Sequence, residues 1–225
     1  LLIRILLPGC LVVVLAGCTG QAWNDPYRAG ESGNPVFFSS FEERPKHLDP
    51  VRSYSSNEWS FISQVYEPPL QYHFLKRPYE LEPLTAEKMP AIRYVGHDGR
   101  EVPAETPAAE VAYTDYVVTI SPGILYQPHP ALAVDESGEP RYWPLSQLQL
   151  DKVNVLADFP ETGTRELVAD DYLYQIKRLA YLPNHSPVTS LMAEHIRGFS
   201  EFSDRAAEAK AVLEAGGGQW LDLRD

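Results

Sequence analysis

The sequence predicts a mixed α/β fold of the α+β kind, and three observations support this. Of its 225 residues, 44% are hydrophobic and 22% are charged, a composition typical of a chain that buries a core. Short β-rich runs and amphipathic stretches of helical period both occur along the chain. They follow one another without a regular strand–helix–strand order, which favours a mixed assembly over a barrel, bundle or solenoid.

Charge and cysteine content exclude several functions. The formal net charge is −12, from 31 acidic and 19 basic side chains, so nucleic acid, which requires a basic stripe, is not an expected partner. The only two cysteines are Cys10 and Cys18. No residue downstream of them can therefore supply a thiol for a disulfide, a zinc site or a nucleophile.

The N-terminus predicts an envelope lipoprotein. Residues 1–17 carry one positive charge, Arg4, and an apolar stretch too short to span a membrane, as expected for a signal peptide. They end in Leu15-Ala16-Gly17-Cys18, which resembles a bacterial lipobox, so we expect lipidation at Cys18; the alternative is an ordinary cysteine beside a cleavage site. Residues 18–35 would then form the lipidated cysteine and a flexible tether. The predicted location is the periplasmic side of the cell envelope, and Thr19 leaves the choice of membrane open.

The first folded elements are expected soon after the tether. Residues 36–41 (VFFSSF) predict a short buried strand, and Leu48-Asp49-Pro50 predicts a turn. Ser55 and Glu58 have the spacing of a capping box. Apolar residues then recur at helical spacing until Pro68-Pro69, so a helix is predicted over residues 56–67.

The middle of the chain predicts a turn and a hairpin. Residues 84–107 are proline-rich and are expected to be irregular, with a turn at 96–99. Residues 113–120 alternate like a strand, and Ser121-Pro122-Gly123 is expected to turn this strand back into residues 124–126 as a hairpin.

Three further helices are predicted towards the C-terminus. Ala169–Ala180 is amphipathic, with Asp170-Asp171 in its first turn and Lys177-Arg178 in its last, as the helix macrodipole prefers. Residues 186–196 form the second. Residues 204–215 form the third, capped by Ser203 and ended by three glycines at 216–218.

No catalytic motif emerges from the residues. Adjacent Asp170 and Asp171 do not converge on one atom, and helix-start electrostatics explain them better. The six histidines are scattered without metal-ligand spacing. The triple glycine follows a helix, the wrong order for a phosphate loop, and Gly-x-Ser-x-Gly is absent. We therefore expect no enzymatic activity, no metal and no cofactor. The many aromatic residues should mostly lie in the core, although clefts for small molecules use the same residues.

The order of several segments resembles the extracellular solute-binding proteins of family 5, the dipeptide- and oligopeptide-binding components of ABC importers. The matching segments are residues 38–41 (FSSF), 48–50 (LDP), 65–70 (VYEPPL), 81–87 (LEPLTAE), 116–124 (YVVTISPGI) and 168–179 (VADDYLYQIKRL), followed by Ser186-Pro187. Three departures, at Thr85, Ser121 and residues 126–130 (YQPHP), suggest a divergent subgroup and bear on the ligand more than on the fold.

The resemblance implies a fold, a function and a site. It implies part of the first lobe of a two-lobed, type II periplasmic-binding-protein clamp, with a first-lobe core at about 36–83 and a subdomain at 84–225, and we expect the chain to be a segment of a longer protein. It implies capture of a peptide or related small solute and delivery to permease subunits by lobe closure. The ligand-contacting residues that it suggests are Ser39, Ser40, Phe41, Tyr66 and Glu67. Alternatives are a non-transporting envelope scaffold with the same fold and, third, a secreted hydrolase.

Overall fold

The computed structural model describes residues 39–218 and 221–224. The predicted signal peptide, Cys18 and the tether at 18–35 lie outside the described residues. The chain divides into two units, Leu1–Glu42 and Glu43–Asp225. All the described helices and strands belong to the second unit. No described helix is both long enough and apolar enough to cross a bilayer.

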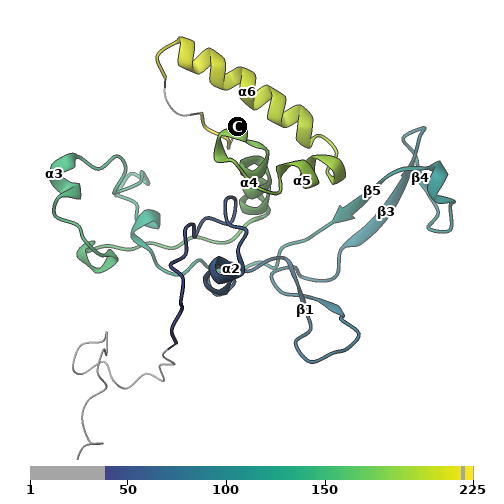
Figure 1. Ribbon diagram of the computed structural model, residues 1–225, viewed down its shortest axis with the longest axis horizontal. Coiled ribbons are helices and arrows are strands. Elements are labelled where there is room, and N and C mark those ends of the chain that lie inside the picture. Colours follow the sequence, from purple (N-terminus) through teal and green to yellow (C-terminus); the bar gives the residue numbers. More distant parts are fainter. Residues whose placement is uncertain (1–38, 219–220, 225) are drawn as a thin grey trace, which may run out of the picture. The chain divides into compact units, whose positions relative to one another are not determined.

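The predicted mixture of helices and strands is confirmed (Figure 1). The strands are short and the helices are concentrated after residue 145. The strands are β1 (Leu70–Tyr72), β2 (Leu81–Pro83), β3 (Ala91–Gly96), β4 (Glu101–Val102) and β5 (Val111–Val117). The α-helices are α2 (Ser56–Ile62), α3 (Gln147–Leu150), α4 (Ala169–Ala180), α5 (Thr189–His195) and α6 (Phe199–Ala215).

The strands form two small antiparallel sheets. β1 pairs with β2, with Leu70 opposite Pro83. The second sheet has the order β4-β3-β5, with Ala91 opposite Val117. β3 and β4 are joined through the predicted turn at 96–99, where the Gly99 N–H donates to the Gly96 carbonyl at 2.9 Å and Gly99 has a φ of 77°. The turn is confirmed.

Two predictions for this region are wrong. Residues 84–107 are not irregular throughout, because Pro90 and Pro103 stand just outside β3 and β4 and so bound these strands without interrupting them. The hairpin between 113–120 and 124–126 does not form either. β5 pairs with β3, Ile120 bridges to Ala86, and Leu125 bridges to Glu166, so the backbone after the turn finds its partner in a later segment.

The helix predictions hold, with different ends. α4 has the predicted bounds, and α2 begins at the predicted capping box, with the Ser55 N–H donating to Glu58 at 3.4 Å. α2 ends at Ile62 and not at 67: residues 63–66 form turns whose N–H groups bond back to residues 59–62, and the Pro69 carbonyl accepts from the N–H groups of Leu84 and Ala86. α6 begins five residues earlier than predicted, after Gly198 at a φ of 84°, and Ser203 is buried inside it.

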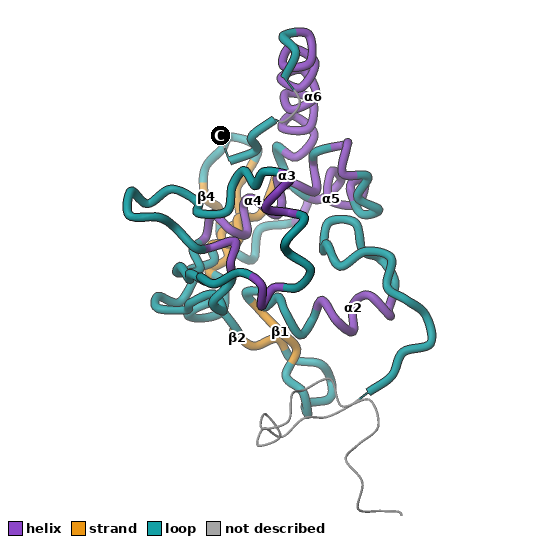
Figure 2. The backbone as a smooth tube through the Cα atoms, turned by 90° about the vertical axis from the view of Figure 1, so that its left-hand side faces the viewer, coloured by secondary structure: helices purple, strands orange, loops and turns teal. Residues whose placement is uncertain are grey.

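Helices α4, α5 and α6 pack against one another. Between β5 and α4 the chain is mostly loop and contains only the short α3 and two 3₁₀ turns (Figure 2). α5 is shorter than predicted because residues 187 and 188 form a turn, in which the Thr189 N–H donates to the Ser186 carbonyl at 3.4 Å. α6 stops where expected. The Gly216 N–H donates to the Val212 carbonyl, and Gly217 has a φ of 82°.

The predicted strand at 36–41 is not supported by its described part. Ser39, Ser40 and Phe41 are exposed coil, and no described strand pairs with them. An apolar run becomes a strand only where a second strand accepts its backbone hydrogen bonds. The prediction rested on composition alone and did not identify such a strand. Residues 36–38 lie outside the described residues.

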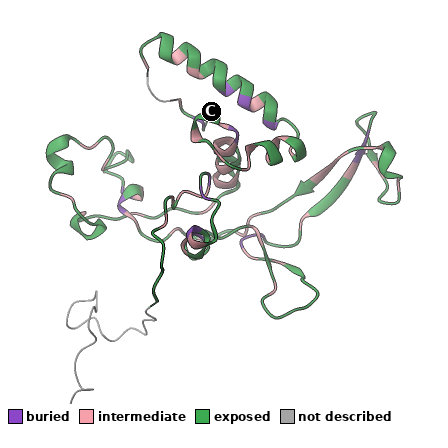
Figure 3. Ribbon diagram, in the orientation of Figure 1, coloured by how far each residue is buried: buried purple, intermediate pink, exposed green. Residues whose placement is uncertain are grey.

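Buried side chains are few and are spread over several parts of the fold (Figure 3). Val51 and Ile62 are 0% and 2% exposed, and Thr85 and Ala86 are also buried. Ala180, Phe199 and Ala206 are buried where α4 meets the last two helices. Of these buried residues, Ile62 also lines the candidate site.

Candidate functional site

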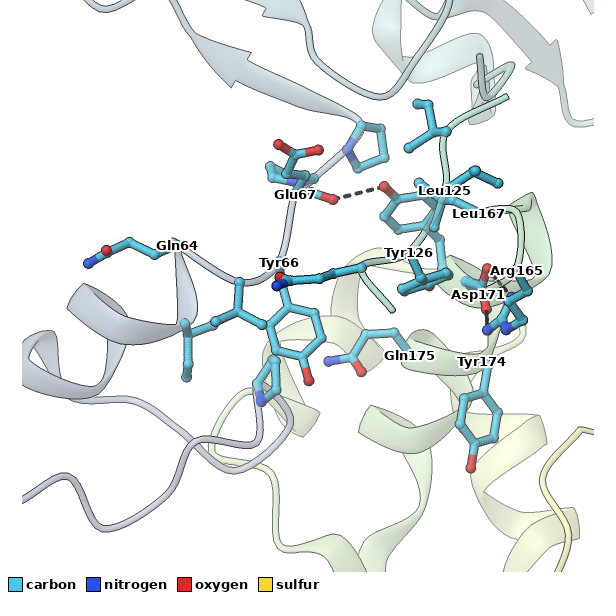
Figure 4. Close-up of a pocket in the computed structure, with 18 of the residues that line it drawn as sticks. Gln64, Tyr66, Glu67, Leu125, Tyr126, Arg165, Leu167, Asp171, Tyr174 and Gln175 are labelled. Atoms are coloured by element: carbon cyan, nitrogen blue, oxygen red, sulfur yellow. Dashed lines mark hydrogen bonds and ion pairs between the residues drawn. The ribbon is translucent and has the colours of Figure 1, made fainter. Parts of the chain in front are cut away.

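A groove of about 650 Å³ lies beside α4, within the second unit. One side is the chain that leaves α2, residues 64–69. A second side is residues 124–127, and the third is residues 165–178, which include most of α4. Figure 4 shows Tyr66 and Gln175 extending into the space between these segments. Its lining is mainly apolar and aromatic, as is typical of pockets that hold small molecules.

Tyr172 fixes the first side of the groove. Its hydroxyl donates to the Glu67 carbonyl oxygen at 2.8 Å and lies 2.6 Å from the hydroxyl of Thr85, which is 1% exposed. The Pro69 carbonyl accepts from the N–H groups of Leu84 and Ala86 at 2.9 and 3.1 Å. Burial raises the pKa of Tyr172, and the hydrogen bond with Thr85 opposes this only in part. The phenol is therefore neutral near pH 7 and can donate to the carbonyl.

An ion pair fixes the opposite side. Arg165 Nη1 donates to Asp171 Oδ2 at 2.9 Å, and Arg165 Nη2 pairs with Asp171 Oδ1. The guanidinium lies over the Tyr126 ring, 4.6 Å from its centre, and Asp171 also accepts from the Val168 N–H at the start of α4. Burial alone would raise the pKa of Asp171, but the hydrogen bonds from Arg165 and Val168 and the charge of Arg165 leave it lowered. Asp171 is thus a charged helix-start residue, as predicted.

A second ion pair joins α4 to the predicted Leu48-Asp49-Pro50 turn. Arg178 Nη1 and Nη2 donate to the two carboxylate oxygens of Asp49 at 3.0 and 2.6 Å, across 129 positions of sequence. Burial tends to raise the pKa of Asp49, but Arg178 and the Val51 N–H together lower it. Arg178 and Pro50 both line the groove, so this bidentate pair holds one end of α4 in place.

Several polar side chains in the lining remain available to a ligand. Within residues 39–218 and 221–224, the side chains of Glu67, Gln127 and Gln175 have no hydrogen-bond partner. An amide offers both a donor and an acceptor, and a carboxylate offers acceptors. Beside aromatic walls, they suit an uncharged or cationic ligand that carries hydrogen-bonding groups. Among the described side chains, no three His, Cys, Asp or Glu residues gather as a metal site.

The site residues suggested by the sequence fall into three groups. Tyr66 and Glu67 line the groove. Ser39, Ser40 and Phe41 are exposed coil in the N-terminal unit, and their role as ligand contacts stays a prediction. Cys18 lies outside the described residues, so its lipidation also stays a prediction.

Most of the residues that line the groove were not predicted from the sequence. Tyr126, Gln127, Arg165 and Gln175 were not identified as site residues. The sequence did carry a signal for Gln175, because Asp171, Gln175 and Arg178 recur at helical spacing beside the apolar face of α4. Residues 124–127 and 165–167 carry no such periodicity, because they meet through isolated bridges between loops.

No family model, no curated protein and no solved structure matches the chain.

Proposed function

We propose that the chain is the ligand-binding part of the substrate-binding subunit of a bacterial ABC importer, and that it captures peptides or related small solutes without catalysing a reaction. One observation carries the proposal: the segments that resemble family 5 meet at the groove. Asp49 of the LDP segment pairs with Arg178, and Tyr172 joins Glu67 to Thr85. These contacts link four of the segments that carry the resemblance.

The chemistry of the lining supports a peptide-like ligand. Backbone amides of a peptide present alternating donors and acceptors, which the carboxamides of Gln127 and Gln175 can match. The rings of Tyr66 and Tyr174 and the neighbouring prolines offer apolar contact to its side chains. Glu67 would favour a cationic group, such as a peptide amine.

The proposed mechanism is capture by closure. The described groove is open to solvent along the exposed residues 64–68, and the resemblance implies a second lobe that would cover it. A ligand held by both lobes stabilises the closed state, because only that state makes all of its contacts. The closed form would then be the one that docks on the permease, with lipid at Cys18 keeping it at the membrane.

A retention experiment tests this proposal. The protein, as its gene encodes it, is incubated with mixed dipeptides and oligopeptides, filtered, and its retained ligands are identified by mass spectrometry. Gln175→Ala should weaken binding roughly tenfold, the effect of losing one hydrogen bond in a desolvated site. The matched control is Gln149→Ala on α3, another helical glutamine, which should leave affinity unchanged.

Two results would contradict the proposal. One is that no peptide is retained. The other is that Gln149→Ala and Gln175→Ala bind peptides equally well. If the protein retains nothing and its deletion alters envelope integrity while peptide uptake stays normal, the envelope scaffold becomes the better interpretation.

A further inference from the structure

The hairpin formed by β1 and β2 ends in an unusually exposed apolar tip, residues 73–80 (HFLKRPYE). Phe74 is 87% exposed, Leu75 is 78% exposed and Tyr79 is 67% exposed. Figure 3 shows the turn beyond β1 as exposed. None of these side chains contributes to the groove. The exposure of large apolar groups in so short a turn is unfavourable in water unless another surface covers them.

The tip has a defined shape. Its base is closed by the His73 N–H, which donates to the Glu80 carbonyl at 2.8 Å, and by edge-on packing of Tyr72 against Tyr79. The Arg77 guanidinium lies 4.3 Å from the centre of the Tyr79 ring and donates to the Lys76 carbonyl at 2.7 Å. The apolar side chains are thus presented by an ordered turn, which lowers the entropy lost on binding.

The charges of the tip favour an anionic partner. Lys76 is paired with Glu80 at 2.6 Å. Arg77 has no carboxylate within ion-pair distance among the described residues and makes only backbone and ring contacts there. The tip therefore offers an uncompensated cation beside aromatic rings, although the chain as a whole carries −12. Tyrosine is enriched at membrane–water interfaces, and a basic side chain near an anionic lipid surface is attracted by about 1 kcal/mol.

Size and position distinguish a bilayer from a protein partner. A stable protein interface covers about 800 Å² on each side, which a turn carrying three large apolar side chains cannot supply alone. A lipid surface needs only a small second contact when an acyl chain already holds the protein. Residues 19–38 separate Cys18 from the first described residue, and a chain of that length reaches at most ~70 Å. A lipidated Cys18 would therefore hold residue 39 within this distance of a bilayer, so a contact between the tip and the lipid needs no further recruitment.

We propose that residues 73–80 insert Phe74, Leu75 and Tyr79 into the interface of an anionic phospholipid bilayer, with Arg77 among the headgroups. This inference rests on the lipid anchor of the proposed function and goes beyond it. The acyl chains supply the affinity for the membrane, and the tip supplies an orientation. It would hold the groove in a fixed relation to the bilayer in which the permease lies.

A site-specific probe tests the inference on the lipidated protein. Within the 225 residues, signal cleavage and acylation leave no free thiol, so Leu75→Cys provides a single position for an environment-sensitive fluorophore once any cysteine outside them is replaced by serine. The protein is reconstituted in vesicles of phosphatidylethanolamine and phosphatidylglycerol that contain nitroxide-labelled lipid. The label at 75 should be quenched by the nitroxide. A label at Trp143→Cys, which replaces a side chain of comparable exposure (78%), should not be. Arg77→Gln should reduce the partitioning of the tip roughly fivefold, the effect of one interfacial cation.

Three outcomes of this experiment would contradict the insertion of the tip, and they differ in what they say about the lipid anchor. Flotation with the vesicles without quenching at position 75 would confirm the anchor and overturn insertion of the tip. A blue shift without nitroxide quenching would mean that a protein surface covers the tip, which also overturns it. Failure to float would overturn the anchor and the tip together, whereas peptide retention by the groove would be unaffected.

Discussion

The region around α2 and α4 differs from the sheet of β3, β4 and β5 in what holds it together. Around α2, polar side chains bind backbone from distant segments. Glu58 alone accepts from the N–H groups of Lys46 and His47 at 3.0 and 2.9 Å and from the Ser53 hydroxyl at 2.8 Å. In the sheet, the strands pair through backbone, while Ile92 and Tyr116 remain 50% and 66% exposed.

The side chains therefore specify the structure of the α2 and α4 region more fully than that of the sheet. Side-chain hydrogen bonds to buried carboxylates specify one arrangement, because every alternative leaves a charge or an N–H unsatisfied. In a sheet with exposed apolar faces, strand pairing sets the register, but nothing specifies which surface packs on those faces. The groove belongs to the first kind of region, so substitutions there should have larger effects than equivalent ones in the sheet.

The largest contrast is expected for two isoleucines. Ile62→Ala removes a side chain that is 2% exposed and should lower the free energy of unfolding by about 2–5 kcal/mol, because a cavity remains. Ile92→Ala in β3, at 50% exposure, should cost under about 1 kcal/mol. Urea denaturation followed by circular dichroism measures both. Equal losses would show that the sheet is as well packed as the α2 region.

Acid should destabilise the α2 region through Glu58. Hydrogen bonds from the Ser55 side chain, the His47 N–H and the Ser53 hydroxyl lower the pKa of Glu58 to about 2 from its ordinary 4.5. Because the folded-state pKa is depressed, this contribution is fully present above about pH 4.5 and is lost as the pH falls towards 2. Melting temperatures recorded from pH 6 downward should therefore fall over this range.

The matched variants for this prediction are Glu58→Gln and Glu136→Gln. The first removes the titrating group and should give a lower melting temperature at pH 6 and a flatter acid dependence. The second lies in an exposed turn and should follow the unsubstituted protein. A Glu58→Gln protein with an unchanged acid profile would assign the acid sensitivity to other carboxylates.

A smaller effect is expected from the two arginine pairs. Arg178→Ala should cost about 1–2 kcal/mol, because a bidentate, half-buried pair with Asp49 is lost while solvent still screens part of it. Arg93→Ala in β3 breaks a looser pair with Asp115, at 3.6 Å, and should cost about 0–1 kcal/mol. A double-mutant cycle with Asp49→Asn isolates the coupling. A coupling near zero would remove Asp49 as the anchor of α4.

The sequence predicted the helices better than the sheets for a physical reason. A helix satisfies its hydrogen bonds locally, so the capping residues Ser55 and Glu58 and the period of Ala169–Ala180 were sufficient. A strand depends on its partner. Residues 91–96 were missed beside Pro90, and a strand was predicted at 36–41 although its described part, residues 39–41, is coil. Of the site, Tyr66 and Glu67 were found through the resemblance, whereas Tyr126 and Arg165 meet only through tertiary bridges between loops.

The smallest contrast concerns one hydroxyl. Thr85→Val keeps the shape of a side chain that is 1% exposed but removes its hydrogen bond with Tyr172, so it should cost about 1 kcal/mol. Thr114→Val in β5 should be neutral or slightly stabilising, since valine suits a strand at least as well as threonine. If Thr85 positions the groove through Tyr172, then Thr85→Val should weaken peptide retention, whereas Thr114→Val should not. Equal retention by the two variants would mean that the Tyr172 bond to the Glu67 carbonyl is sufficient without Thr85. In that case residues 66–69 would owe their position to the backbone bonds at Pro69, and the buried hydroxyl would serve stability alone.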